Sequence, residues 1–133
     1  MMQRSVHTRS LYWLGERDRD GVYLDGGRTY RLTVPLPVPG RLFWSLTVYD
    51  AEKRSEIQTD RNRAALRSLF ELADAAGDPS VDLYFGPDPA DHPDDRSVET
   101  IPGRGWFGYF RIYGPEEAAF DGSWRLPDFE PLG

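Results

Sequence analysis

The sequence predicts an all-β fold: an antiparallel β-sandwich of the jelly-roll type with one inserted helix at about residues 60–76. Several short segments alternate apolar and polar residues, which is the pattern of strands with one buried face. Turns rich in glycine and proline separate these segments, and the chain has 13 glycines and 11 prolines. A parallel α/β fold would need a crossover helix after nearly every strand, and only one segment has helical periodicity.

The length of 133 residues suits a single domain. The polar first segment, residues 1–10, is predicted to be a flexible N-terminal tail, and residues 11–133 are predicted to form a single β-sandwich domain. Leu11 can begin the first strand. Charged and glycine-containing turns then follow at residues 17–21 and 25–27.

Two strands are predicted on either side of a proline-rich connection. Residues 29–34 (TYRLTV) alternate between two faces, and residues 42–49 (LFWSLTVY) are rich in β-branched and aromatic residues. The second strand has an apolar face and a mixed polar and aromatic face, made respectively by Leu42, Trp44, Leu46, Val48 and by Phe43, Ser45, Thr47, Tyr49. Prolines at positions 35, 37 and 39 cannot donate to a ladder, so this segment is expected to cross between two sheets.

The one predicted helix, at about residues 60–76, rests on apolar residues that recur at i, i+3 and i+4. These residues are Ala65, Leu66, Leu69, Phe70 and Ala73. Thr59 or Asp60 can cap its start, and Gly77 can end it.

Three further strands complete the predicted sandwich, at residues 80–85, 96–101 and 106–113. The last of them (WFGYFRIY) is strongly aromatic. Residues 86–95 contain three prolines and four aspartates and are predicted to form a loop.

Composition excludes several classes of function. The chain has no cysteine, which rules out disulfides, thiolate metal sites and a cysteine nucleophile. Its net charge of −6 argues against a nucleic-acid partner, since non-specific binding rests on neutralising phosphates. No apolar run approaches the ~20 residues of a membrane helix, and no signal-peptide pattern is visible. No membrane partner and no cofactor are predicted, and the cytoplasm is the expected location.

Three strings that look like motifs have plainer interpretations. Residues 103–108 spell GxGxxG but open a strand instead of a helix, so Gly108 is expected to make room for a neighbouring ring or to mark a bulge. Residues 16–21 resemble part of a calcium loop, yet Gly27 stands where its glutamate should fall, and a charged turn is expected. The acidic loop around His92 could hold a divalent cation; a solvated loop is the competing interpretation, and no metal site is predicted.

The aromatic residues of strands 42–49 and 106–113 are the most suggestive feature for function. Trp44, Tyr49, Arg111 and Tyr113 are predicted to bind a ligand, because aromatic rings in a jelly-roll groove can stack on sugars or other flat molecules. The guanidinium of Arg111 lies among aromatics and needs a carboxylate or a ring face as its partner. A packed core for the rings and a structural ion pair for Arg111 are the competing interpretations.

Several strings of residues resemble one known family, over a stretch from about Tyr12 to Glu130. They are Phe43-Trp44-Ser45, Tyr49-Asp50, the run from Asp82 to Pro87, Pro102-Gly103, the run from Arg111 to Pro115, and Trp124. On these residues the chain resembles the domain of unknown function family 1214. The resemblance implies a β-sandwich of the jelly-roll type and assigns no catalytic residues.

Two departures from the family pattern shape the expectations about partners. Relatives usually carry a domain of unknown function family 1254 ahead of this one, so the chain is expected to be a stand-alone version, a split-gene product or a remnant. An apolar face left exposed by the missing neighbour predicts a homo-oligomer or a separately encoded partner domain. Relatives also typically carry Asn-Asn-Trp where this chain has Asp95-Arg96-Ser97, so a site at that corner would be altered here.

The leading functional hypothesis is a ligand-binding or protein-interaction module without catalytic activity. The alternative is a hydrolase or lyase that acts on a small or carbohydrate-like substrate, with carboxylates, Arg111 and tyrosines in an aromatic groove. That alternative requires a concave pocket that contains a carboxyl group with a raised pKa.

Overall fold

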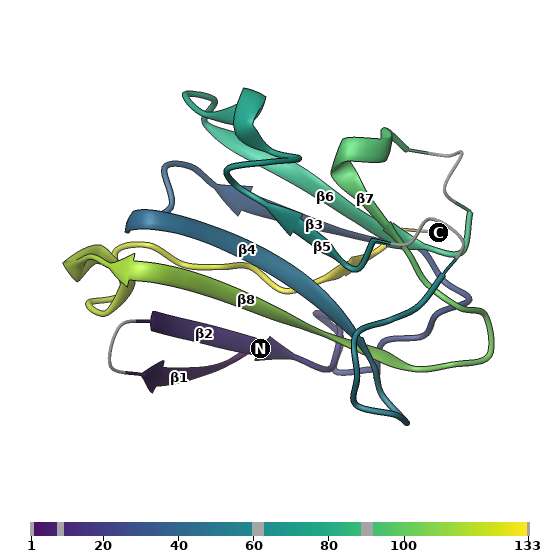
Figure 1. Ribbon diagram of the computed structural model, residues 1–133. Helices are drawn as coiled ribbons and strands as arrows, with labels where there is room; N and C mark the ends of the chain where they lie inside the picture. The colour runs from purple at the N-terminus through teal and green to yellow at the C-terminus, as the bar shows by residue number, and fades with distance from the viewer. Residues whose placement is uncertain (1, 8–9, 60–62, 89–91, 133) are drawn as a thin grey trace.

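Two β-sheets lie face to face in the computed structural model, which describes residues 2–7, 10–59, 63–88 and 92–132 (Figure 1). The five-stranded sheet has the order β1 (Gln3–His7), β2 (Ser10–Gly15), β8 (Trp106–Pro115), β4 (Gly40–Asp50), β5 (Ala65–Arg67). The four-stranded sheet has the order β7 (Ser97–Glu99), β6 (Ser80–Gly86), β3 (Tyr30–Pro35), β9 (Glu130–Pro131). Neighbouring strands run antiparallel, with the exception of β6 and β7. The all-β sandwich is therefore confirmed, and the jelly-roll connectivity stays a prediction.

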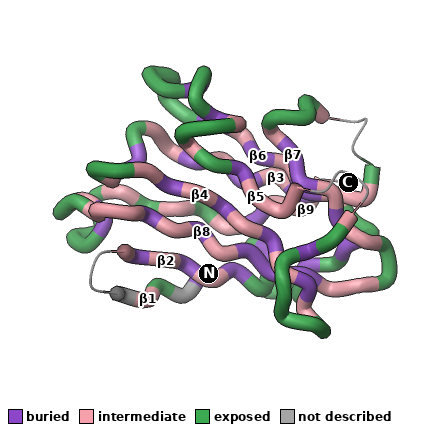
Figure 2. Tube along the Cα trace, in the orientation of Figure 1, coloured by how far each residue is buried: buried purple, intermediate pink, exposed green. Residues whose placement is uncertain are grey.

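The core lies between the sheets, where every second residue of the long strands is buried (Figure 2). In β3 the side chains of Tyr30, Leu32 and Val34 are fully buried, whereas those between them are half-exposed. Burying one aliphatic side chain of this size contributes ~1.5–3 kcal/mol. A slip of one residue would turn all of these side chains outward, so burial fixes which side chains form each outer face.

Aromatic rings fill one part of the core. Trp106 stacks on Phe85 with the ring centres 5.2 Å apart and meets Phe129 edge-on at 5.1 Å. A Cβ atom at position 108 would lie 3.1 Å from Cζ of Phe129. Gly108 thus makes room for a neighbouring ring, as expected from the sequence.

The helix expected at about residues 60–76 is wrong for the part that the structure describes, residues 63–76. That part holds β5 and the 3-10 turn η1 (Ala73–Ala75). Leu66 pairs with Leu46 of β4 and is fully buried. It is therefore the inward-facing residue of a short strand, and not part of the apolar face of a helix. The backbone N–H of Ser68 donates to Trp44 in β4 instead of to a helical carbonyl. Pairing with β4 overrides the local helical pattern, and residues 60–62 lie outside the described residues.

The N-terminal segment adds a strand to one sheet, and the proline-rich segment links the two sheets. Residues 3–7, expected from the sequence to belong to a tail, form β1 in antiparallel register with β2. Residues 36–39 link β3 in the four-stranded sheet to β4 in the five-stranded sheet, which confirms the crossing expected from the three prolines.

Candidate functional site

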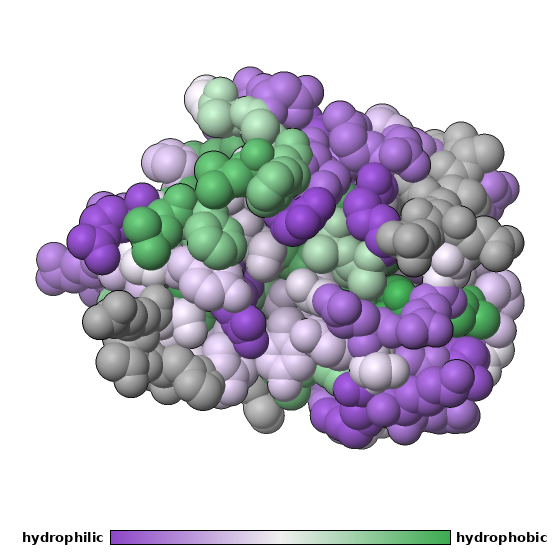
Figure 3. Space-filling model, in the orientation of Figure 1, coloured by the Kyte–Doolittle hydropathy of each residue, from purple (hydrophilic) through white to green (hydrophobic). Residues whose placement is uncertain are grey.

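The outer face of the five-stranded sheet carries most of the residues singled out from the sequence. Tyr12 of β2, Arg111 of β8 and Ser45 of β4 lie directly opposite one another across the three central strands. We define the tyrosine face as the half-buried, outward side chains of β2, β4 and β8 around this row: Tyr12, Tyr49, Tyr109, Arg111, Tyr113. Figure 3 views this side of the molecule, which is pale over these strands because tyrosine, serine and threonine have intermediate hydropathy.

Arg111 lies at the centre of the tyrosine face. Its Nη1 donates a hydrogen bond to the Tyr113 hydroxyl at 3.0 Å, and its guanidinium carbon lies 5.6 Å from the ring centre of Tyr12. The Nε atom is shielded from solvent and has no hydrogen-bond partner among the residues that the structure describes. The hydrogen bond to Tyr113 raises the pKa of Arg111, so the side chain stays charged. Within the described residues this cation has aromatic neighbours but no carboxylate, and a ring face is its partner.

Tyr49 lies at one end of the tyrosine face. Its ring stacks on Phe107 at 5.4 Å and meets Tyr109 edge-on at 5.3 Å. Burial, followed by the nearby carboxylate of Glu56, raises the pKa of the Tyr49 hydroxyl. The phenol therefore stays neutral and can both donate and accept a hydrogen bond at neutral pH.

Trp44 lies on the opposite side of the sheet from the other three residues that the sequence grouped with it. Its ring is 8% exposed and stacks on Phe110 at 5.2 Å, inside the sandwich. The structure thus brings Tyr49, Arg111 and Tyr113 together on one face and places Trp44 in the core. Successive side chains of a strand point to opposite faces of the sheet. Trp44 pairs with Ile112 and points inward, whereas Tyr49, Arg111 and Tyr113 occupy the alternate positions and point outward.

An exposed apolar patch adjoins the tyrosine face, and the residues that form it were not predicted from the sequence. Leu42 is 59% exposed, Leu69 60% and Phe70 64%. Figure 3 shows hydrophobic residues gathered over the same side of the molecule. A register shift between Gly40 and Phe43 takes Leu42 out of the apolar face to which strict alternation assigned it. The sequence signal for Leu69 and Phe70 was misleading, because they matched a helix that does not form.

Asp50, a buried carboxylate at the end of β4, stabilises the turn that follows this strand. Asp50 is 5% exposed and accepts hydrogen bonds from Nε of Arg104 at 2.6 Å and from the backbone N–H groups of Glu52 and Lys53. The Arg104 guanidinium holds the pKa of Asp50 far below its usual range. In the part of the chain that the structure describes, every resolved pKa shift of a carboxyl group is downward, opposite to that of a general acid.

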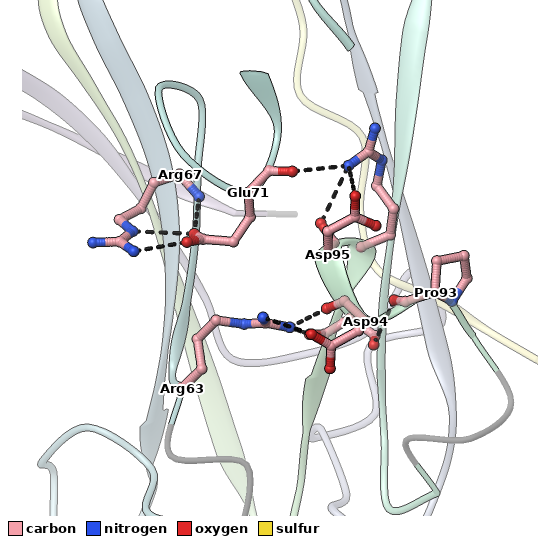
Figure 4. Close-up of polar contacts among 8 residues, drawn as sticks. Arg63, Arg67, Glu71, Pro93, Asp94 and Asp95 are labelled. Carbon is pink, nitrogen blue, oxygen red and sulfur yellow. Dashed lines mark hydrogen bonds and ion pairs between the residues drawn. The ribbon is translucent and has the colours of Figure 1, made fainter. Parts of the chain in front are cut away.

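The acidic loop is tied to the strand β5 region by arginines (Figure 4). Arg63 donates to the backbone carbonyls of Asp94 and Ser97, and Arg96 donates to the carbonyl of Glu71 at 3.0 Å. Arg96 also pairs with Asp74 at 2.8 Å. These contacts join the segments that flank β5, at an edge of one sheet, to β7 and the segment before it, at an edge of the other. Arg96, in the Asp95-Arg96-Ser97 segment that departs from the family pattern, therefore connects the two sheets.

The cation-binding interpretation of the acidic loop has no support in this geometry. His92 stacks on Tyr84 with ring centres 3.9 Å apart. Among the described residues, no group of three or more histidine, aspartate or glutamate side chains is arranged to hold a metal ion. Asp91, the remaining acidic residue of the loop named from the sequence, lies outside the described residues.

The charged segment that resembled a calcium loop is a turn. Residues 17 and 23 form an antiparallel bridge, and Oδ1 of Asp18 accepts hydrogen bonds from the backbone N–H groups of Asp20 and Val22. Gly21 has a φ of 84°, a left-handed conformation that glycine adopts without strain. The charged turn expected from the sequence is confirmed.

No helix in the described part of the chain is long and apolar enough to cross a membrane.

Comparisons with known proteins place the chain in a family but assign no activity. The family model described as "Protein of unknown function (DUF1214)" matches residues 9–117. A search of curated proteins returns no match. Among solved structures, the VPA0106 protein from Vibrio parahaemolyticus is similar, with a TM-score of 0.79 and 22% sequence identity. The similarity covers 94% of this chain but only 31% of that protein, and at this identity it shows the fold.

Proposed function

We propose, on the premise that this chain belongs to the DUF1214 family of proteins of unknown function, that it is a non-catalytic module whose tyrosine face binds another polypeptide. The observation that carries this proposal is Arg111, a charged group at the centre of an aromatic outer face. Its Nε is shielded and unpartnered, and Tyr113 is its hydrogen-bonded neighbour.

The residue types of this face support a protein partner. Interfaces are enriched in tyrosine, phenylalanine and arginine, and such residues supply most hot spots. The apolar patch of Leu42, Leu69 and Phe70 lies at the border of the tyrosine face, and exposed apolar patches commonly mark interaction sites. Together they offer an aromatic centre with one cation and an apolar border.

The partner that fits this surface presents apolar side chains around one carboxylate. The carboxylate would pair with Arg111, which needs no existing ion pair to be broken. A second copy of the same face fits less well, because a two-fold axis near Arg111 would bring two guanidinium groups together. The similar Vibrio protein is about three times as long as the matched region, which supports a separately encoded further domain as the partner.

The hydrolase or lyase alternative has less support. It requires a carboxyl group with a raised pKa, whereas the shifts resolved among described carboxyl groups are all downward.

Photocrosslinking from position 70 tests the proposed function. A photoreactive phenylalanine analogue at Phe70, in cells that produce the chain, is expected to give one discrete adduct with a different polypeptide. The same analogue at Phe120, which is 42% exposed, serves as the matched control and is expected to give no such adduct. Arg111→Gln in the Phe70 variant should lower the adduct yield at least ~10-fold, since losing one partner of a buried charge pair costs more than 1.4 kcal/mol.

Three outcomes would overturn this proposal: an adduct with a second copy of the chain, equal adducts from positions 70 and 120, or a yield that does not depend on Arg111. The melting temperature of each variant checks that its fold is intact.

A further inference from the structure

A cleft of about 360 Å³ lies where β1, the edge strand of the five-stranded sheet, meets the segment that follows β8 (Figure 1). Arg4 of β1 pairs with Trp13 of β2, and both residues line the cleft. The facing wall lies within residues 119–126, after the 3-10 turn η4 (Glu117–Ala119). The volume is at the lower end of the ~300–1,000 Å³ range of ligand sites, so it suits a small molecule.

Hydrogen bonds and ring packing hold Trp124, the largest side chain of the facing wall, in place. Its backbone N–H donates to the carbonyl of Ala118 at 3.2 Å, and its indole Nε1–H donates to the carbonyl of Pro35 at 2.9 Å. The ring also stacks on Phe110 with the ring centres 5.7 Å apart. A ligand would therefore not have to order this wall before binding.

The apolar part of the lining is accessible to a ligand. Trp124 and Leu126 line the cleft and are half-exposed, so neither side chain is withdrawn into the core. Trp13, which is 8% exposed, meets Trp124 edge-on at 5.5 Å and supports it from within the sandwich. An aliphatic or aromatic group in the cleft would remove the exposed parts of Trp124 and Leu126 from water.

The charged part of the lining is cationic. Among the described residues that line the cleft, only Arg4 and Arg125 are charged. Nη1 of Arg4 donates to the carbonyls of Ala119 and Phe120, at 3.3 and 3.2 Å. Nε of Arg125 donates to the carbonyl of Gly122 at 3.4 Å. Phe120 and Gly122 are two residues apart, so their Cα atoms lie within ~7 Å of each other, and one turn holds both guanidinium groups at the cleft.

Both of these positive charges are uncompensated within the described structure. Their hydrogen-bond acceptors are neutral carbonyl oxygens, and neither Arg4 nor Arg125 forms an ion pair with a carboxylate there. The chain as a whole has a net charge of −6, so two unpaired cations beside an apolar wall are a local exception. This combination complements an anion that carries an apolar group.

We propose that this cleft binds a small monocarboxylate with an apolar tail, of the class of the short fatty acids and the arylalkanoic acids. The carboxylate pairs with Arg4 and Arg125, and the tail packs on Trp124 and Leu126. Arg4 pairs with the inward-facing Trp13, on the opposite side of the sheet from the tyrosine face. The inference therefore does not rest on the proposed function.

A titration followed by nuclear magnetic resonance tests the proposal. Hexanoate and 3-phenylpropionate are added separately to ¹⁵N-labelled full-length protein, and the assigned indole N–H signals are followed. A saturable shift of the Trp124 signal is expected, while that of Trp106, which is 2% exposed and does not line the cleft, stays in place. Hexanol and hexylamine have the same tail without the carboxylate, so each is expected to bind at least ~10-fold more weakly than hexanoate.

Arg125→Gln separates binding from folding. Arg125 is exposed and donates a single printed-length bond of 3.4 Å, so the variant is expected to fold and to bind hexanoate at least ~10-fold more weakly. Arg4→Gln should weaken binding in the same way, and its melting temperature checks that the fold is intact. Arg41→Gln is the matched control, because Arg41 is exposed, forms no ion pair in the described structure and lies outside the cleft. It should bind hexanoate as the parent protein does.

The proposal is overturned if the Trp124 signal does not respond to hexanoate up to about 10 mM, well beyond the millimolar affinity of a weak site. Hexanol binding as tightly as hexanoate would contradict it, since the cleft would then recognise only the tail. Equal weakening by Arg125→Gln and Arg41→Gln would also contradict it, because any surface cation would then have the same effect.

Discussion

Replacing Gly26 with alanine is expected to destabilise the fold by more than ~3 kcal/mol, the largest effect expected of any single substitution described for this chain. A Cβ atom at this position would overlap the carbonyl oxygen of Ile101 and lie 2.6 Å from that of Arg104. Both obstacles are backbone atoms, which cannot turn aside as a flexible side chain could. Gly26 also donates to the Arg104 carbonyl at 2.9 Å and accepts from the Thr100 hydroxyl at 2.8 Å.

The neighbouring glycine supplies a matched control. A Cβ atom on Gly27 would come no closer than 3.5 Å to its surroundings, an ordinary contact. Gly27→Ala is therefore expected to change stability by no more than ~0.5 kcal/mol. Urea unfolding of the two variants and the parent protein measures the difference. Equal midpoints for Gly26→Ala and Gly27→Ala would contradict the packing described around this turn.

Asp50→Asn is expected to cost about 2–3 kcal/mol of stability at neutral pH. The buried carboxylate loses its charge-assisted bonds to Nε of Arg104 at 2.6 Å and to Nη2 at 3.0 Å. Breaking a fully buried pair costs ~3–5 kcal/mol, but Arg104 is 29% exposed and retains Glu52 as a second partner at 3.0 Å, which reduces the cost.

The stability difference between the parent protein and Asp50→Asn depends on pH, because the pKa of Asp50 is lower in the folded protein than in the unfolded chain. The folded-state pKa of Asp50 lies below the ~3.9 of an unfolded aspartate. Its contribution is therefore complete above about pH 5 and is lost as the pH falls toward the folded-state value. The stability gap between the parent and Asp50→Asn, from urea unfolding at several pH values, should shrink only on acidification below about pH 5.

Glu52→Gln is the matched control for Asp50, because Glu52 contacts the same arginine but is 72% exposed. It should cost no more than ~1 kcal/mol. A gap for Asp50→Asn that stays constant down to pH 2, or an equal cost for the two variants, would show that the buried pair does not stabilise the fold as described.

Much of the fold follows from period-two patterns in the sequence. The strands at residues 42–49 and 106–113 appear as the long strands β4 and β8, and the mixed face of Ser45, Thr47 and Tyr49 does point outward beside Arg111. Alternation fixes these assignments because each long strand buries one face.

The features that were missed depend on contacts between distant segments. Leu66, Leu69 and Phe70 have helical spacing, yet backbone pairing with β4 makes Leu66 a strand residue and leaves the other two exposed. The position of Leu42 depends on a register irregularity beside β8 that no local pattern reveals. The grouping of Trp44 with Tyr49 ignored strand parity, because the two residues lie on opposite faces of one predicted strand.

The contacts of Arg96 that connect the two sheets could not be predicted for the same reason. Arg96 appeared only as a departure from a family pattern, and its partners Glu71 and Asp74 lie more than twenty residues away in the chain.

Hydroxyl-radical footprinting of tyrosines tests most directly the claim that a partner covers the tyrosine face. Oxidation is compared between the chain in the cells that produce it and the purified protein, with Tyr84, on the other sheet, as the internal reference. The expected result is a several-fold lower oxidation of Tyr109 and Tyr113 in cells, with Tyr84 unchanged, and restored oxidation in the Arg111→Gln variant. Equal oxidation of Tyr109 and Tyr113 in cells and after purification would contradict the claim.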